Sequence, residues 1–245
     1  MGPPGGREHE LRQAVLNWWA GQRARYGFTA RLRVLLSELW GFILESMPER
    51  RRRRYGDVEY DWDHGVDTTS ATVGWRERLL GVFHSPYQPT EPALFHEMLQ
   101  SLPTDLAGFT FIDLGSGKGR ALLMASEYPF RKIIGVELLS ELHRVASENL
   151  RKYASEKQRC SNLEAQYGDA SEFNFHRDPI VLYLFNPLPE ASLEAVVQNL
   201  ERSLRQYPRK VFVLYHNPLL EQVLAASPVL KRTGGTHQYS VYVSV

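Results

Sequence analysis

The chain of 245 residues contains a single cysteine, Cys160, and no long uncharged apolar run. One cysteine excludes an internal disulfide and suits a reducing compartment. A membrane-spanning helix needs about 18 or more consecutive apolar residues, and no stretch of this sequence approaches that length. The first residues also lack the apolar core of a signal peptide. We therefore expect a cytoplasmic protein with no transmembrane segment.

Two patterns on which many catalytic sites depend are also missing. The eight histidines are scattered, and none stands with cysteine or aspartate at the spacing of a metal site. No set of serine, histidine and aspartate can be assembled from spacing alone. We therefore expect no resident metal and no nucleophilic triad.

The formal net charge of +1 conceals an uneven distribution. Residues 1–54 hold eleven arginines against five glutamates, a charge of +6, and five of these arginines are consecutive at 50–54. Apolar residues at three- and four-residue intervals predict two helices here, at about 8–26 and 29–47. The simplest interpretation is a helical cap on a catalytic domain. RNA or DNA contact stays possible but is not favoured, because no recognisable nucleic-acid module is present, and docking on an anionic membrane surface also stays open.

Residues 109–120 form the most informative stretch, Phe-Thr-Phe-Ile-Asp-Leu-Gly-Ser-Gly-Lys-Gly-Arg. An apolar β-prone run ends at Asp113, glycines follow at every second position, and a helix-forming run begins at Arg120. Strand, tight turn and helix in this order let the backbone approach a nucleotide-like ligand closely. A dinucleotide fingerprint would have its third glycine where Arg120 stands, and Asp113 would repel a pyrophosphate. The loop therefore suits a cationic ligand better.

With this D-x-G-x-G-x-G motif the chain resembles the class I S-adenosylmethionine (SAM)-dependent methyltransferases, including uncharacterised bacterial members of that superfamily. The resemblance implies an α/β fold: a doubly wound, mostly parallel seven-stranded sheet with an antiparallel last strand, plus an N-terminal helical extension. We expect the extension and an irregular linker to span residues 1–84 and the SAM-binding domain to span residues 85–245. By resemblance, the methionine end of SAM would be held by Asp113, Gly115, Ser116, Gly117 and Gly119.

Two further strand ends continue this pattern. The β-branched stretch 131–137 ends in Glu137, 22 positions after Gly115 and close to the spacing of about 20 at which an acid meets ribose hydroxyls. The stretch 163–169 ends in Asp169, which by resemblance faces the adenine amino group. Leu138 and Ala170, the next residues along, are further expected cofactor contacts. An aspartate after a strand also commonly caps a helix or turn, and that alternative stays open for Asp169.

The acceptor side of the site is assigned to the end of the fourth predicted strand, the apolar run 180–185. Asn186-Pro187 follows it. In the family's amine methyltransferases an asparagine or aspartate at this place accepts hydrogen bonds from the amine, so Asn186 is both the catalytic candidate and a cofactor contact. Leu188 and Pro189 replace the proline and aromatic ring of that motif, which leaves N-methylation open. His216 is a weaker candidate for a general base.

A Tyr-x-Pro-Thr element, Tyr87 to Thr90, precedes the glycine motif and resembles one in a group of bacterial class I methyltransferases. By that resemblance Tyr87 and Thr90 cover the methionine end of the cofactor, although Thr90 would equally cap a helix at 92–102. Residues 55–90 otherwise look irregular. Their acid-rich part, 57–67, is interpreted either as a site for a cationic substrate or as a surface loop.

These expectations combine into a SAM-dependent methyltransferase with an unidentified acceptor, either a protein or a small molecule. Asn186 slightly favours an amine such as a protein lysine. Two alternatives stay open, because a fold alone does not fix a reaction. One is a non-catalytic SAM-fold module that binds RNA or a protein partner through its basic N-terminal arm. The other is an NAD-linked oxidoreductase, which Arg120 and Asp113 oppose.

Overall fold

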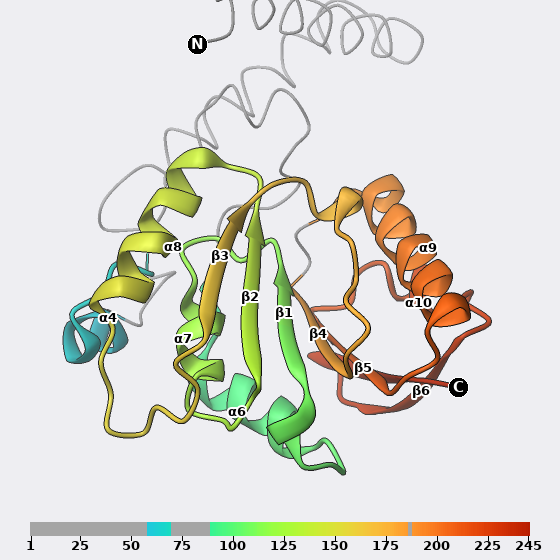
Figure 1. Cartoon of the computed structure of the whole chain (residues 1–245), viewed down its shortest axis with the longest axis horizontal. Coiled ribbons are helices and arrows are strands. Elements are labelled where there is room, and N and C mark those ends of the chain that lie inside the picture. The colour runs from blue at the N-terminus through green and yellow to red at the C-terminus, as the bar shows by residue number, and fades with distance from the viewer. Residues whose placement is uncertain (1–57, 70–88, 186–187) are drawn as a thin grey trace, which may run out of the picture. The chain divides into compact units, whose positions relative to one another are not determined.

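The structure is a computed structural model that describes residues 58–69, 89–185 and 188–245 (Figure 1). Its centre is a seven-stranded sheet in the order β3-β2-β1-β4-β5-β7-β6. The strands are β1 (Thr110–Leu114), β2 (Lys132–Glu137), β3 (Leu163–Tyr167), β4 (Ile180–Phe185), β5 (Val211–His216), β6 (Leu230–Gly235) and β7 (Tyr239–Ser244). Strands β1 to β5 pair in parallel, and β7 lies antiparallel between β5 and β6. The strand order reverses between β1 and β4, which is where an open α/β sheet binds its ligand.

The central strands form because their sequences are nearly continuous apolar runs. Every residue of β1 and β5 is buried, as are all residues of β2 except its first and all residues of β4 except its last. Such runs are typical of strands that are covered by helices on both faces of the sheet. The edge strands β3 and β6 carry polar residues and are partly or mostly exposed. The sequence therefore determines which strands lie inside the sheet.

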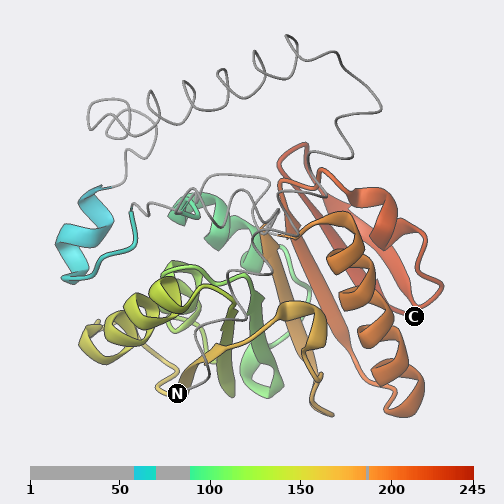
Figure 2. The ribbon, with the colours of Figure 1, turned by 90° about the horizontal axis from the view of Figure 1, so that it is seen from above.

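Helices cover both faces of the sheet, and two apolar cores result. One core joins α6 (Pro92–Gln100) and α7 (Arg120–Ala125) to the side of β1 that carries Phe111. The other joins α9 (Glu190–Gln206) and α10 (Glu221–Ala225) to the side that carries Ile112. Helix α8 (Ser140–Lys152) packs along β2 and β3, and Figure 2 shows it far from α9, at opposite ends of the sheet. The short helices η1 (Leu106–Gly108) and η2 (Ala170–Glu172) complete the fold.

The strand order and the antiparallel β7 confirm the predicted sheet, which is seven-stranded, mostly parallel and Rossmann-like. The expectation of an irregular stretch at 55–90 is wrong for its first part, because α4 (Val58–His64) is helical. The segment that contains α4 belongs to the same compact unit as the sheet, although it precedes residue 85. Within the described ranges, no helix is long and apolar enough to cross a membrane. The helices predicted at 8–26 and 29–47 lie outside the described residues.

Thr90 does not cap the following helix. The N-cap of α6 is Glu91, without a side-chain cap, and the helix begins at Pro92, where a fixed φ and a missing N–H are tolerated. The hydroxyl of Thr90 is instead hydrogen-bonded to the Tyr183 hydroxyl, at 3.0 Å. Thr90 is thus tied to the central strand β4 rather than to its own helix.

Candidate functional site

The loop between β1 and α7 has the tight geometry that its glycines predict. Gly115, Gly117 and Gly119 have φ of 89°, 55° and 85°, a region that residues with a Cβ rarely enter. The backbone N–H groups of Gly115 and Ser116 both donate to the carbonyl of Val136, at 2.8 and 3.0 Å. The loop is therefore held against the end of β2. We call residues 115–119 the glycine loop.

A glycine within β2, which the sequence analysis did not single out, allows this close packing. A Cβ on Gly135 would lie 2.5 Å from Cδ1 of Leu122 and 2.8 Å from Cβ of Ser116. Both distances are shorter than any ordinary contact, so the loop and α7 approach β2 only because position 135 is glycine. A glycine inside a strand is the sequence signal for such an approach. The Ser116 hydroxyl is buried here without a hydrogen-bond partner among the described residues.

Two carboxyl groups, Asp113 and Glu137, flank the glycine loop at the carboxyl ends of β1 and β2. Each is only 3% exposed. The oxygens of Glu137 accept backbone hydrogen bonds from Gly117 and Leu139, each at 2.8 Å. Burial raises the pKa of Asp113 well above its usual range, and the nearby charge of Glu137 raises it further. Burial also raises the pKa of Glu137, and its backbone hydrogen bonds only partly oppose this. The pair would be stabilised by a cation and by hydroxyl donors.

The end of β3 joins the same edge of the sheet. The N–H of Gly168 donates to the carbonyl of Glu137, at 3.1 Å. Asp169 is exposed, and its Oδ1 accepts from the N–H and the hydroxyl of Ser171, at 2.8 and 2.7 Å. Asp169 therefore caps η2, the alternative that the sequence left open, and it retains its second carboxylate oxygen. Ala170 is buried beside it, whereas Leu138 is 40% exposed.

A buried polar chain crosses the neighbouring strands on the Asp113 side. The Tyr183 hydroxyl lies 3.0 Å from Oγ1 of Thr90 and 2.8 Å from Nδ1 of His216. Tyr183 stands opposite Asp113 in the parallel register of β1 and β4, so the two side chains share a face. Burial raises the pKa of Tyr183 and lowers that of His216 to about 4. His216 is thus neutral near pH 7 and only a weak base.

The sequence analysis missed Tyr183 because it forms part of an apolar run. A phenol within a strand that is buried on both faces is the signal that could have found it, since such a hydroxyl needs a partner.

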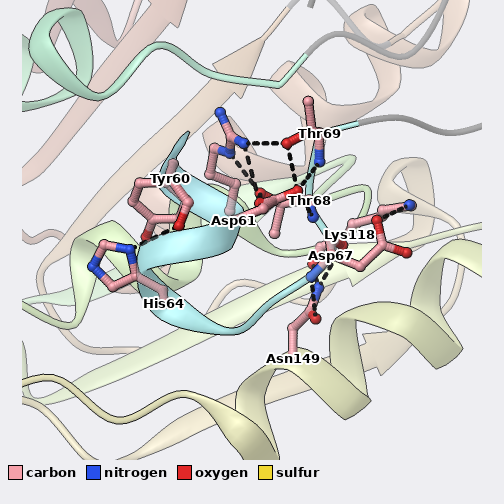
Figure 3. Close-up of polar contacts among 9 residues, drawn as sticks. Tyr60, Asp61, His64, Asp67, Thr68, Thr69, Lys118 and Asn149 are labelled. Carbon is pink, nitrogen blue, oxygen red and sulfur yellow. Dashed lines mark hydrogen bonds and ion pairs between the residues drawn. The ribbon is translucent and has the colours of Figure 1, made fainter. Parts of the chain in front are cut away.

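The acid-rich stretch 57–67 is not a loop that is exposed throughout, because residues 58–64 are helical and Tyr60 is buried. Asp61 binds Arg120, and Asp67 binds Lys118, so these two acids pair with cations of the chain itself (Figure 3). Trp62, at 86% exposed, remains on the surface. Spacing could not predict either pair, because the partners lie more than fifty positions apart.

Two predicted site residues, Tyr87 and Asn186, lie outside the described residues. Among the residues that are described, no three or more histidine, cysteine, aspartate or glutamate side chains are grouped as a metal site. The candidate site consequently comprises the glycine loop, the two buried acids, the end of β3 and the Thr90–Tyr183–His216 chain.

Comparison with known proteins adds matches in fold only. No family model matches the sequence, and no curated protein matches it. Similar solved structures include an RNA methyltransferase from Salinibacter ruber in complex with S-adenosyl-L-homocysteine, with 22% identity over 64% of this chain and 92% of that chain and a TM-score of 0.42. A geranyl diphosphate methyltransferase in complex with sinefungin is 13% identical, with a TM-score of 0.46. That match covers 63% of this chain and 77% of the other chain. The YcgJ protein of Bacillus subtilis is 20% identical, with a TM-score of 0.41. That match covers 55% of this chain and 56% of the YcgJ chain, so this chain spans little more than half of that protein's length.

Proposed function

We propose that this chain is a SAM-dependent methyltransferase. One observation carries the proposal: two buried carboxyl groups, Asp113 and Glu137, flank a positive-φ glycine loop at the carboxyl ends of neighbouring parallel strands. Burial raises the pKa of both groups, so a cation bound beside them would be stabilised. SAM offers an ammonium and a sulfonium together with two ribose hydroxyls, which match this requirement.

Each part of the cofactor has a matching group at this edge of the sheet. Asp113 would accept from the amino group of the methionine end, and Glu137 from the ribose hydroxyls through lone pairs that its two backbone hydrogen bonds leave available. Asp169 and Ala170 would contact the adenine, and Leu138 would pack beside the ribose. The hydrogen bond between Thr90 and Tyr183 supports the assignment of Thr90 to the methionine end.

When bound, SAM supplies a methyl group that its sulfonium makes electrophilic. The task of the chain is then to place the acceptor in line with that methyl group and to exclude water, and positioning of this kind accounts for a large part of a rate enhancement. Asn186, which follows β4 in the sequence, would orient the acceptor. His216 is too weak a base to deprotonate an ammonium at neutral pH. An amine that arrives deprotonated, such as a protein lysine, is therefore the acceptor that we favour.

The first experiment is calorimetric titration of the purified protein with SAM and S-adenosylhomocysteine. We expect micromolar binding of both, and a loss of about tenfold or more in Glu137→Gln, because hydrogen bonds to a charged group contribute about 1.5–3 kcal/mol. Glu194→Gln, which changes an exposed acid on α9, is the matched control and should bind normally. Labelled methyl groups would then identify the acceptor.

A folded wild-type protein that binds NADH but neither SAM nor S-adenosylhomocysteine would overturn the proposal. The NAD-linked alternative requires a glycine-like close approach where the chain has Arg120, and Arg120 is already bound to Asp61. The alternative of a non-catalytic module would be supported if both ligands bind but no acceptor receives a labelled methyl group.

A further inference from the structure

The glycine loop contains a lysine, Lys118, and the following helix α7 begins with Arg120. Both side chains are bound by acids from one segment that is distant in the sequence. Arg120 is 2% exposed and donates from Nη2 to Oδ1 of Asp61, at 3.2 Å. Lys118 is 6% exposed and donates from Nζ to Oδ1 of Asp67, at 2.6 Å. We call residues 60–69 the acidic strap. Two acids of the strap, Asp61 and Asp67, thus bind these two cations.

The first ion pair is embedded in a network that keeps it ionised. Asp61 accepts from the backbone N–H groups of Thr68 and Thr69, each at 2.7 Å, and from both of their hydroxyls. Arg120 donates in turn to the same two hydroxyls, at 2.6 and 3.0 Å. Burial alone would raise the pKa of Asp61, but these hydrogen bonds and the Arg120 charge hold it below its ordinary value. The carboxylate is therefore charged at neutral pH.

The second ion pair is fixed through the backbone. Asn149 of α8, which is 2% exposed, donates from Nδ2 to the carbonyl oxygens of Asp67 and Lys118, at 2.8 and 2.9 Å. Its Oδ1 accepts from the N–H of Asp67, at 3.0 Å. Figure 3 shows Asp67 close to Lys118 and Asn149. Lys118 stands between Gly117 and Gly119, so this amide fixes the strap and the glycine loop together.

Charge compensation at this place has a chemical consequence. A glycine loop with an unpaired lysine is the arrangement with which many proteins bind phosphate groups. Here the lysine and the arginine are both neutralised, whereas the two buried acids Asp113 and Glu137 retain their effect on the site. The local field therefore favours a cationic ligand.

We propose that Asp61 and Asp67 are positioning residues that cancel the charges of Arg120 and Lys118, and so make the site prefer cationic SAM over its product S-adenosylhomocysteine. The product has one positive charge fewer, because its sulfur is a neutral thioether. This inference rests on the proposed function and adds a determinant of cofactor specificity to it.

The test is the ratio of SAM to S-adenosylhomocysteine affinity, because a purely structural role would weaken both ligands equally. Asp67→Asn is the first variant, since the Asp67 side chain is 64% exposed and its loss should be tolerated in folding. At low ionic strength we expect SAM to bind about three- to tenfold more weakly and S-adenosylhomocysteine to change less than twofold, because an exposed pair is partly screened.

Three further proteins complete the design. The double variant Asp67→Asn/Lys118→Met should restore the ratio, because it removes the uncompensated charge. Lys118→Met alone leaves Asp67 unpaired and should shift the ratio toward SAM. Asp63→Asn, which removes another exposed acid of the acidic strap, is the matched control and should leave the ratio unchanged.

The outcomes separate this inference from the proposed function. Equal weakening of both ligands in Asp67→Asn, or an unchanged ratio in both Asp67→Asn and Lys118→Met, overturns the inference while SAM binding by the wild type upholds the cofactor assignment. A wild-type protein that binds neither ligand overturns both. A ratio that shifts in opposite directions in the two single variants and returns in the double variant supports the inference.

Discussion

Asp113 is a carboxyl group whose ionisation the ligand-free fold opposes. Its pKa is raised by burial and by Glu137, so the folded state binds its proton more tightly than the unfolded state does. The contribution of this proton to the free energy of unfolding is fully present below the pKa of the unfolded state, about 4. It is lost as pH rises through the pKa of the folded state. Asp113 therefore lowers the stability of the free protein near neutrality, which is the expected effect of a residue placed for a ligand.

Asp113→Asn is consequently expected to stabilise the ligand-free protein. A neutral amide removes the cost of burying the charge, so the melting temperature at pH 8 should rise by a few degrees, since about 1 kcal/mol corresponds to roughly 2–4 °C in a domain of this size. The same variant should lose SAM affinity. Scanning calorimetry at pH 8 and at pH 4 is the measurement, and the gain should be confined to the higher pH. A variant that melts lower than wild type at both values would contradict the argument.

His216 provides a second expectation at the level of one residue. Burial lowers the pKa of His216 to about 4, so the folded state resists protonation of this ring. Its contribution to the free energy of unfolding is fully present above the unfolded pKa of about 6.5 and is lost as pH falls toward 4. Proton NMR titration should show one histidine ring that titrates near 4. That signal should disappear in His216→Gln. The His216 ring stacks on Phe185, with ring centroids 3.8 Å apart. If no histidine titrates near 4, the ring is not buried in this way.

Tyr183→Phe tests the chain that ties Thr90 to His216. The substitution keeps the ring but leaves two buried partners unsatisfied, at a cost of about 1–3 kcal/mol in unfolding free energy. The pKa of His216 should change with it, because Nδ1 loses its hydrogen bond. Denaturant unfolding and the same NMR titration provide the two readouts. Tyr207→Phe, at a partly exposed phenol beyond α9, is the matched control.

The close approach of β2 and the glycine loop leads to a prediction for two elements together. Gly135→Ala should cost about 1–3 kcal/mol, because its Cβ overlaps Leu122 and Ser116, and it should weaken SAM binding by displacing the loop. Gly234→Ala in β6 is the matched control, since the nearest atom to its Cβ would be 3.9 Å away. Equal effects of the two substitutions on SAM affinity would contradict a role of position 135 in shaping the loop.

Sequence patterns predicted the elements that are dictated locally. The apolar runs of β1, β2, β4 and β5 are long enough and apolar enough to specify buried parallel strands. The glycine loop was predicted because positive φ confines the choice of residue at its turns. The positions of Asp113 and Glu137 at strand ends follow from the same patterns. These features depend on neighbours within a few residues.

The remaining features depend on partners that are distant in the sequence. Helix α4 has seven residues and a polar sequence, so periodicity gave no signal for it. Asp61 and Asp67 belong to a stretch that the sequence left as either a cationic-substrate site or a surface loop, whereas the fold places them beside Arg120 and Lys118. Thr90 had a local alternative as a helix cap, yet its hydroxyl contacts Tyr183, 93 positions later. Side-chain pairs of this kind require the tertiary structure.

At the level of the whole molecule, SAM should raise the melting temperature, and the rise should grow with the logarithm of the ratio of SAM concentration to Kd. A ligand at about 100 times its Kd adds about 2.7 kcal/mol to the unfolding free energy, which corresponds to roughly 5–10 °C here. Thermal melts at increasing SAM concentrations are the measurement. Glu137→Gln should need a higher concentration for the same shift, whereas Glu194→Gln should follow the wild type. No shift for any of them would mean that the folded state has no site for SAM.

The acidic strap also bears on the order in which the molecule folds. Asp61 meets Arg120 across 59 positions of chain, whereas the turns of the glycine loop are set by residues within a few positions of one another. Closing a long segment is entropically slow compared with forming local turns and helices. The loop is therefore shaped early but acquires its charge balance late, and during refolding the preference for a cationic ligand should be among the last native properties to return.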